Sequence, residues 1–312
     1  MNFYFAPMEG ITGYIFRNAH HTYYNQVDKY FSPFITASQH DSFKGKERND
    51  ILPDNNPGVV LIPQLLTNNA KDFNYTAKKL KALGYDEINL NLGCPSGTVV
   101  SKYRGSGFLA KPLELDAFLE EIFAEAVTKI SIKTRIGKEH PEEFYQLMEI
   151  YNKYPMEELI IHPRIQKDFY KNTPNMEIFR YAVANSKNRI CYNGDIFTAC
   201  DYRRFQAEYP EITRVMLGRG LLSNPGLIAA ITEDGNLSKE RLLAYHNEIY
   251  VGYKELFFGD RNVLFKMKEL WLYLIKAFSD SDKYAKKIKK SERCIDYEEA
   301  VARLFEECEL IY

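Results

Sequence analysis

Short apolar runs with strand propensity alternate with longer amphipathic segments through roughly the first 225 residues of the chain. The runs predict eight strands, at Asn2–Ala6, Tyr30–Thr36, Val59–Leu66, Glu87–Leu92, Lys129–Arg135, Glu158–His162, Arg189–Tyr192 and Arg214–Leu217. Helical period predicts helices between most of them, at Ala70–Leu83, Leu113–Val127, Glu142–Tyr154, Met176–Ser186 and Cys200–Ala207. The connection after Thr36 is the exception, because it is polar and poor in helical pattern. Strands that alternate with helices build a parallel sheet.

Eight strands in this length fit a (β/α)₈ TIM barrel better than an open doubly wound sheet. After Asn224 and Pro225 the pattern changes, and only helical period remains from about residue 238 onward. We therefore expect an α/β fold in which a TIM barrel, residues 1–235, is followed by a small C-terminal all-helical domain, residues 236–312.

Composition places the chain among globular proteins and hides a local asymmetry of charge. Of its 312 residues 45% are hydrophobic and 27% charged, and the net charge is -1. That balance alone excludes a global positive field for nucleic acid. Residues 254–293, however, carry eleven Lys and Arg against six Asp and Glu, whereas residues 294–312 carry one against six. A solvated helix face is the plain interpretation of the densest basic run, Lys283, Lys286, Lys287, Lys289, Lys290 and Arg293.

Cysteine usage and hydropathy favour a cytoplasmic protein. The five cysteines are scattered and never spaced as C-x-x-C, so we expect neither disulfides nor a metal site. No apolar run reaches the roughly 18 residues of a membrane span, and residues 1–20 lack the features of a secretory signal.

Polar residues end most of the predicted strands, where the active site of such a barrel lies. Alternation puts Lys133 and Arg135 on one face of their strand, and it likewise pairs Asn89 with Asn91 and Ile160 with His162. The other strand ends are Ala6-Pro7-Met8-Glu9-Gly10, Gln64, Asn193-Gly194-Asp195 and Gly218-Arg219-Gly220. The last two groups follow strands seven and eight, where barrels commonly bind phosphate through backbone N–H groups. An ordinary βα turn uses glycine equally well.

Cys94 opens a long Gly- and Ser-rich connection, residues 94–111, at the predicted barrel mouth. No histidine base is near it in sequence, and a thiol with its ordinary pKa of about 8.5 is mostly protonated at neutral pH. That state suits a proton donor. Within the same loop Gly105 to Ala110 matches G-x-G-x-x-A, but it follows no strand and is rejected as a dinucleotide fingerprint.

At these residues the sequence resembles the tRNA-dihydrouridine synthase family, flavin-dependent enzymes that reduce uridine in RNA. The matches run in the family's order over residues 6–220, and the most specific is Asn91-Leu92-Gly93-Cys94-Pro95 with the continuation Arg104-Gly105-Ser106-Gly107. The helical tail matches the family's C-terminal domain. Gly13 departs from the pattern, since many members carry Asp after Ile11-Thr12.

The resemblance implies FMN as cofactor, NADPH or NADH as reductant and tRNA as substrate. It carries FMN binding to Pro7, Met8, Glu9, Gln64, Lys133, His162, Asn193, Gly194, Asp195, Gly218 and Arg219. Hydride from the flavin then reaches C6 of the uracil, and Cys94 protonates C5. For the RNA we expect contacts from Asn91, Lys102, Arg135, Arg164, Lys286, Lys287, Lys289 and Lys290. A monomer is expected.

Three alternatives remain open at the level of the sequence. One is an FMN barrel oxidoreductase for a small pyrimidine of the dihydroorotate type, which would not need the basic helical tail. A second is a Schiff-base lyase that uses Lys133, because barrels often place such a lysine on a strand. The third is a non-catalytic RNA-binding protein, against which intact Cys94 and Lys133 argue.

Overall fold

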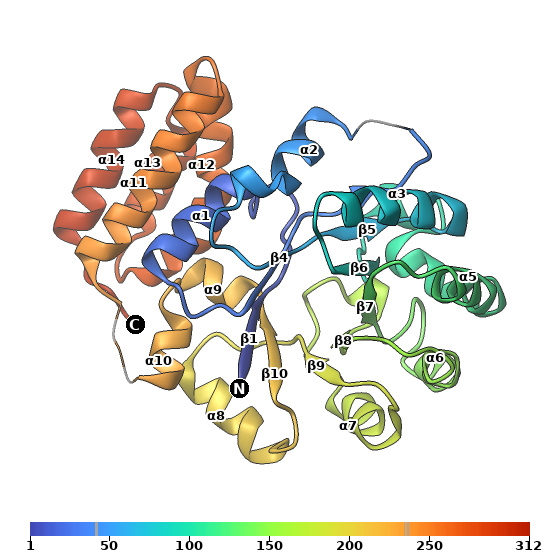
Figure 1. The fold of residues 1–312 in the computed structure, drawn as a ribbon. Coiled ribbons are helices and arrows are strands. Elements are labelled where there is room, and N and C mark those ends of the chain that lie inside the picture. The colour runs from blue at the N-terminus through green and yellow to red at the C-terminus, as the bar shows by residue number, and fades with distance from the viewer. Residues whose placement is uncertain (41–42, 234, 236) are drawn as a thin grey trace.

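A computed structural model describes residues 1–40, 43–233, 235 and 237–312 and places a parallel barrel at the centre of the molecule (Figure 1). Its sheet contains ten strand segments in the order β3-β5-β6-β7-β8-β9-β10-β1-β2-β4, and all neighbours are parallel. The segments are β1 Asn2–Phe5, β2 Lys29–Phe31, β3 Ile35–Thr36, β4 Leu61–Ile62, β5 Gln64–Leu66, β6 Glu87–Leu92, β7 Lys129–Arg135, β8 Leu159–His162, β9 Ile190–Tyr192 and β10 Arg214–Leu217.

Ten segments arise from eight strands because two predicted strands are each interrupted by a proline. Pro33 lies between β2 and β3, and Pro63 lies between β4 and β5. Proline has no N–H to give to the ladder, so hydrogen bonding lapses there while the chain stays extended. Since β2 pairs with β4 and β3 with β5, each interrupted strand continues past its proline. β1 pairs with both β2 and β10, so the sheet closes on itself. The predicted TIM barrel is confirmed.

Helices cover the outside of the barrel (Figure 1). The helices that follow the barrel strands along the chain are α1 Tyr14–Tyr23, α2 Gly45–Ile51, α3 Ala70–Ala82, α4 Gly97–Val100, α5 Pro112–Ala124, α6 Glu143–Tyr151, α7 Met176–Asn185, α8 Ala199–Glu208, α9 Arg219–Ser223 and α10 Leu227–Thr232. Short 3₁₀ turns lie at Pro53–Asn55, Gly105–Ala110 and Gln166–Asp168. In the described part of the connection after Thr36, which was expected to be helix-poor, lie the short α2 and the 3₁₀ turn at Pro53–Asn55.

Local sequence explains where several of these helices begin. Asn69 accepts a hydrogen bond from the Asp72 amide at the start of α3. At α8 the Thr198 hydroxyl and the Asp201 carboxylate cap each other's backbone amides, which is a capping box. Such caps satisfy donors that have no partner within the helix.

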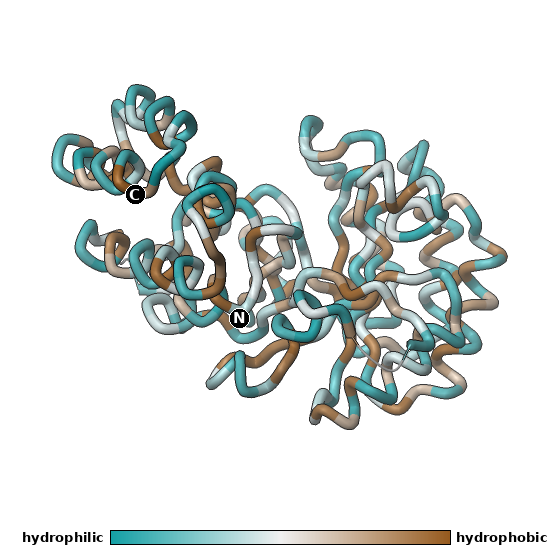
Figure 2. Tube along the Cα trace, turned by 90° about the horizontal axis from the view of Figure 1, so that it is seen from above, coloured by the Kyte–Doolittle hydropathy of each residue, from teal (hydrophilic) through white to brown (hydrophobic). Residues whose placement is uncertain are grey.

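The C-terminal region is helical, as predicted. It comprises α11 Lys239–Leu256, α12 Asp260–Leu274, a 3₁₀ turn at Ile275–Ala277, α13 Asp282–Lys290 and α14 Cys294–Glu307. Hydrophilic and hydrophobic residues follow one another along these helices (Figure 2), as in amphipathic helices. The Lys266 ammonium of α12 donates to the Gly10 carbonyl, 2.6 Å away, in the loop after β1. The helical region therefore reaches the mouth of the barrel.

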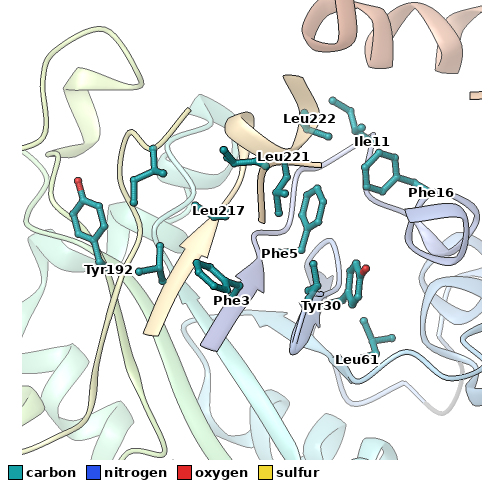
Figure 3. Close-up of a cluster of buried hydrophobic side chains, with 14 of the residues drawn as sticks. Phe3, Phe5, Ile11, Phe16, Tyr30, Leu61, Tyr192, Leu217, Leu221 and Leu222 are labelled. Carbon is teal, nitrogen blue, oxygen red and sulfur yellow. The ribbon is translucent and has the colours of Figure 1, made fainter. Parts of the chain in front are cut away.

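Alternation along the strands divides the core into two parts. Side chains on the outer face pack against the helices, as Phe3 and Phe5 of β1 do beside Leu217, Leu221 and Leu222 (Figure 3). A separate, smaller cluster fills the barrel interior: Tyr4, Ala6, Phe31, Ile62, Ile160, Cys191 and Met216. The interior of β6 and β7 is instead polar, and its residues lead toward the carboxyl ends of the strands.

Candidate active site

A cavity of about 330 Å³ opens at the carboxyl ends of the barrel strands. This volume is within the range of pockets that hold small-molecule ligands. Thirteen of the predicted site residues line it: Pro7, Met8, Glu9, Gln64, Asn91, Cys94, Lys133, Arg135, His162, Asn193, Gly194, Gly218 and Arg219. The structure thus gathers residues from seven strand ends in one place, as parallel strands in a barrel require.

Cys94 is held at the cavity by its own backbone. Its amide and that of Gly93 both donate to the Asn91 carboxamide oxygen, at 2.9 and 3.0 Å. Its carbonyl accepts from the amide and the hydroxyl of Ser106, at 3.1 and 2.8 Å. Burial raises the pKa of the Cys94 thiol. At neutral pH the sulfur therefore keeps its proton.

Lys133 of β7 faces the same cavity as a cation without an internal partner. Among the described residues, no side chain or carbonyl accepts a hydrogen bond from its Nζ atom, although the side chain is half-buried. Burial, followed by the charge of Arg135, lowers the pKa of Lys133 to about 8. A desolvated ammonium in this position favours a ligand that brings electronegative atoms or negative charge.

Arg135 is a structural clamp at the mouth of the barrel. Its guanidinium donates to three backbone carbonyls, those of Gly93, Ile165 and Phe169, at 3.0, 2.8 and 2.8 Å. The side chain is 2% exposed, and its burial lowers its pKa. It ties the loop that follows β6 to the loop that follows β8. Its predicted contact with RNA stays a prediction.

Asp195 joins two arginines beside the cavity and does not line it. The carboxylate accepts from both terminal nitrogens of Arg164, at 3.1 and 2.5 Å, and from Arg219 at 2.5 Å. Arg164 is 1% exposed, and it also lies outside the cavity lining. This arrangement favours a role for Arg164 and Asp195 in positioning Arg219. Direct contact of either residue with a ligand stays a prediction.

His162 is neutral and has a defined tautomer. Its Nδ1 atom lies 2.7 Å from the Asn193 carbonyl oxygen, which can only accept, so Nδ1 carries the proton. Burial, with the charges of Arg135 and Lys133, lowers the pKa of His162 well below its ordinary value. The unprotonated Nε2 atom is left as a weak acceptor toward Arg164.

Gly194, after β9, and Gly220, after β10, lie so close to neighbouring atoms that a Cβ atom would overlap them. A Cβ atom at Gly220 would lie 2.2 Å from the Ile196 carbonyl oxygen, and one at Gly194 would lie 2.0 Å from the Tyr192 hydroxyl oxygen. Such approaches are far inside van der Waals contact. Gly220 is therefore required by the close approach of the Ile196 backbone, whereas a side chain at Gly194 would force the Tyr192 ring to move, whatever the loops bind.

Several lining residues were missed in the sequence analysis. Phe169, Tyr170 and Phe197 line the cavity, and the Arg219 guanidinium lies over the Tyr170 ring, 4.5 Å from its centroid. Both Phe169 and Tyr170 are 44% exposed. Two adjacent aromatics in the polar loop after His162 were the available signal.

The remaining predicted residues lie apart from this cavity. Lys102 is exposed on the loop after α4. Lys286, Lys287, Lys289 and Lys290 are exposed on α13, and three of them line a shallow groove with Arg303 of α14. Within the described part of the chain, no three His, Cys, Asp or Glu side chains gather as metal ligands would. Its helices include none with the length and hydropathy of a membrane span.

A closed parallel barrel with a polar cavity at its strand ends is the architecture of barrel enzymes. Residues 4–310 match the family described as dihydrouridine synthase (Dus). The chain belongs to this family.

Among curated relatives, a probable tRNA-dihydrouridine synthase of Staphylococcus aureus is 26% identical over 72% of this chain and 69% of its own length. The tRNA-dihydrouridine(16) synthase of Pseudomonas putida is 29% identical over 74% and 73%. Among solved structures, morphinone reductase is 12% identical and covers 78% of this chain and 88% of its own, with a TM-score of 0.51. A histamine dehydrogenase from Rhizobium covers 75% of this chain and 46% of its own, with 11% identity and a TM-score of 0.57. The last two likenesses concern the fold.

Proposed function

We propose that this protein is a tRNA-dihydrouridine synthase that reduces the C5=C6 bond of uridine in tRNA, with FMN as cofactor and NADPH as reductant. The observation that carries the proposal is a protonated thiol, Cys94, and an unpartnered ammonium, Lys133, that line one cavity in a chain of the Dus family. None of the comparisons favours the dihydroorotate-type enzyme or the lyase.

The cavity fits FMN by its donor set. Lys133 lacks an acceptor among the described residues, and a flavin has carbonyl oxygens and, when reduced, negative charge on its pyrimidine edge. The backbone at Gly194 and Gly218 and the guanidinium of Arg219 line the same cavity and supply donors for a phosphate. Pro7, Met8, Glu9, Gln64, His162 and Asn193 would complete the binding site.

The chain's own chemistry is proton delivery. Bound FMN would supply hydride for C6 of uracil, whose C5=C6 bond is conjugated to the C4 carbonyl. Cys94 then donates its proton to C5, and the thiolate that remains lies near the positive charges of Arg135 and Lys133. A proton donor of this kind typically contributes about 10²- to 10⁴-fold in rate.

The RNA is expected to place one unstacked uridine in the cavity and to rest on the helical region. Phe169 and Tyr170 offer exposed rings at the mouth, and rings of this kind stack on unpaired bases. Lys286, Lys287, Lys289 and Lys290 offer positive charge to phosphates. In this proposal residues 1–235 are the catalytic domain and residues 236–312 the tRNA-binding domain; residue 236 lies outside the described residues.

Location and assembly complete the proposal. All five cysteines are unpaired thiols, which fits the reducing cytoplasm where we expect the protein to work. We expect it to act as a monomer.

The first test is dihydrouridine formation in tRNA by purified protein with FMN and NADPH. Cys94→Ala is expected to bind FMN with unchanged affinity and to lose about 10²- to 10⁴-fold in kcat. Cys200→Ala, which changes an exposed cysteine of α8, is the matched control and should keep full activity. Wild-type rates in Cys94→Ala would refute the assigned role, and wild-type protein that neither binds FMN nor forms dihydrouridine would refute the function.

A further inference from the structure

A chain of buried amides begins at the backbone of Cys94 and runs down the barrel interior. Asn91 accepts from the Cys94 amide, and its own Nδ2 atom donates to the Gln64 Oε1 atom at 2.6 Å. Gln64 Nε2 donates in turn to Asn89 Oδ1 at 2.7 Å. The side chains come from β5 and β6 and point into the barrel. Both Gln64 and Asn91 line the cavity.

The chain continues to the opposite end of the barrel. Asn89 Nδ2 donates to the Ser131 hydroxyl oxygen at 3.0 Å, and that hydroxyl donates to the Glu87 carboxylate at 2.8 Å. We call Glu87, Ser131, Asn89, Gln64 and Asn91 the amide relay. Asn89 and Ser131 are fully buried, and the other three are at most 8% exposed. Water therefore cannot replace a lost partner at low cost.

Both ends of the amide relay impose the same direction on it. At the upper end, the Gly93 and Cys94 amides can only donate, so Asn91 must turn its oxygen toward them. At the lower end, Glu87 is a carboxylate that can only accept, so Ser131 must donate to it. Each amide between them can satisfy its neighbours in one orientation only. A flip at any link would set two donors or two acceptors against each other.

An ion-pair network at the opposite end of the barrel from Cys94 holds Glu87, the lower end of the amide relay, in place. The Lys29 ammonium donates to the second oxygen of Glu87 at 2.7 Å and to Glu158 at 2.5 Å. Glu158 also accepts from the Tyr4 hydroxyl at 3.0 Å, and Arg214 approaches it to 3.6 Å. Both oxygens of Glu87 are therefore engaged, one by Ser131 and the other by Lys29.

We propose that Glu87 and Ser131 are positioning residues for the reaction, although they lie at the far end of the barrel from Cys94. Through the amide relay they orient the carboxamides of Gln64 and Asn91. Each of these then turns its oxygen to the protein and keeps one N–H free for a ligand carbonyl in the cavity. They also hold the backbone of Cys94. The role in catalysis rests on the proposed function, but the role in holding Cys94 does not.

The test compares Ser131→Ala with Tyr4→Phe. Each substitution removes one buried hydroxyl that donates to a glutamate paired with Lys29, but Tyr4 lies outside the amide relay. The first measurement is the rate at which iodoacetamide alkylates Cys94 in protein without cofactor, followed on the Cys94 peptide by mass spectrometry. The second is kcat for uridine reduction, and the third is Tm.

In Ser131→Ala we expect Cys94 alkylation to rise about tenfold, the equivalent of one lost hydrogen bond. We expect kcat to fall about 10- to 100-fold, as misplaced groups commonly cause. Tyr4→Phe should lower Tm to a similar degree and leave both rates within about twofold of wild type. Ser131→Thr, which restores the hydroxyl, should recover the alkylation rate.

Glu87→Gln is a second variant that keeps the shape of the side chain. Lys29 would bind the oxygen of the new carboxamide, so the Nε2 atom of that carboxamide would face Ser131 and reverse the last hydrogen bond of the amide relay. The expected effects have the same sign as in Ser131→Ala. Alkylation at the wild-type rate in both variants would overturn the proposal. Faster alkylation in a protein whose wild type makes no dihydrouridine would support the relay and refute only the proposed function.

Discussion

At the scale of single residues, Lys133 holds its charge in a partly buried position at the cavity. Its ammonium faces the cavity without an acceptor among the described residues, and burial lowers its pKa to about 8. An unpaired, desolvated charge is costly in the empty protein. That cost is recovered when a ligand brings negative charge to Nζ, so the site is prepared for an electron-rich partner before it binds.

Lys133→Met removes the positive charge and keeps a side chain of similar length, so it tests what the charge contributes. We expect the reduction potential of bound FMN to become more negative, because the positive charge that stabilises the reduced anion is gone. Spectroscopic titration with a reference dye measures the potential. Lys138→Met, which changes a lysine in the loop after β7, should leave it unchanged. A shift toward more positive values in Lys133→Met would contradict the assignment.

At the scale of elements, three helices of the C-terminal region meet at one buried histidine. Trp271 of α12 can only donate, and its Nε1 atom lies 2.7 Å from the Tyr297 hydroxyl of α14. Tyr297 therefore donates to His246 Nε2 of α11 at 2.5 Å. The Nδ1–H of His246 is left to donate to Asn247 Oδ1 at 2.9 Å. Burial favours the neutral ring, in which Nε2 carries no proton and accepts from Tyr297.

The stability of this region is expected to depend on pH. Burial lowers the pKa of His246 to about 4, so below its ordinary pKa of about 6.5 the unfolded chain takes up a proton that the folded chain refuses. The free energy of unfolding should fall by about 2 kcal/mol from pH 7 to about pH 5 on account of this group. Urea denaturation of wild type and His246→Gln measures the difference, and equal pH dependence in the two proteins would contradict it.

Much of the barrel could be predicted because its signals are local. Apolar alternation marks a strand wherever one face packs on helices, as at Ile88, Leu90 and Leu92. Polar residues at strand ends become neighbours once the strands are parallel, which brought Cys94 and Lys133 to one cavity. Pro33 and Pro63 were visible in the sequence, yet their effect is on the ladder and not on the path of the chain.

The rest depended on contacts that sequence spacing does not encode. Arg135 and Arg164 look like free cations at strand ends, but folding supplies carbonyls and Asp195 as partners from loops up to 42 residues away. The polar base of the barrel was missed for the same reason. Glu87 and Glu158 begin their predicted strands and read as solvent-exposed charges, whereas Lys29 reaches both of them in the folded chain.

At the scale of the whole molecule, the near-neutral net charge conceals a basic helix. The lysines of α13 are exposed, while Tyr284 and Ile288 of the same helix are buried. Double-stranded and folded RNA attract such a face through phosphate contacts that release counterions. The affinity for tRNA should therefore depend steeply on salt.

The double substitution Lys286→Glu with Lys290→Glu tests this surface. We expect weaker tRNA binding and a salt dependence whose slope, log Kd against log salt, is reduced by about 2. The matched control is Lys71→Glu with Lys78→Glu, which makes the same change of charge on exposed positions of α3. Filter binding at several salt concentrations measures both. Equal losses in the two double variants would assign the effect to net charge and not to α13.

The closure of the barrel also governs the order in which this protein can assemble. β1 hydrogen-bonds to β10 in the register Asn2 with Arg214, so β1 leaves the ribosome long before its partner and completes its pairing only after more than two hundred further residues have been made. Until then one edge of β1 stays unpaired and available to other chains. Synthesis of this protein should thus include a window in which a nascent-chain chaperone that covers β1 raises the yield of folded enzyme.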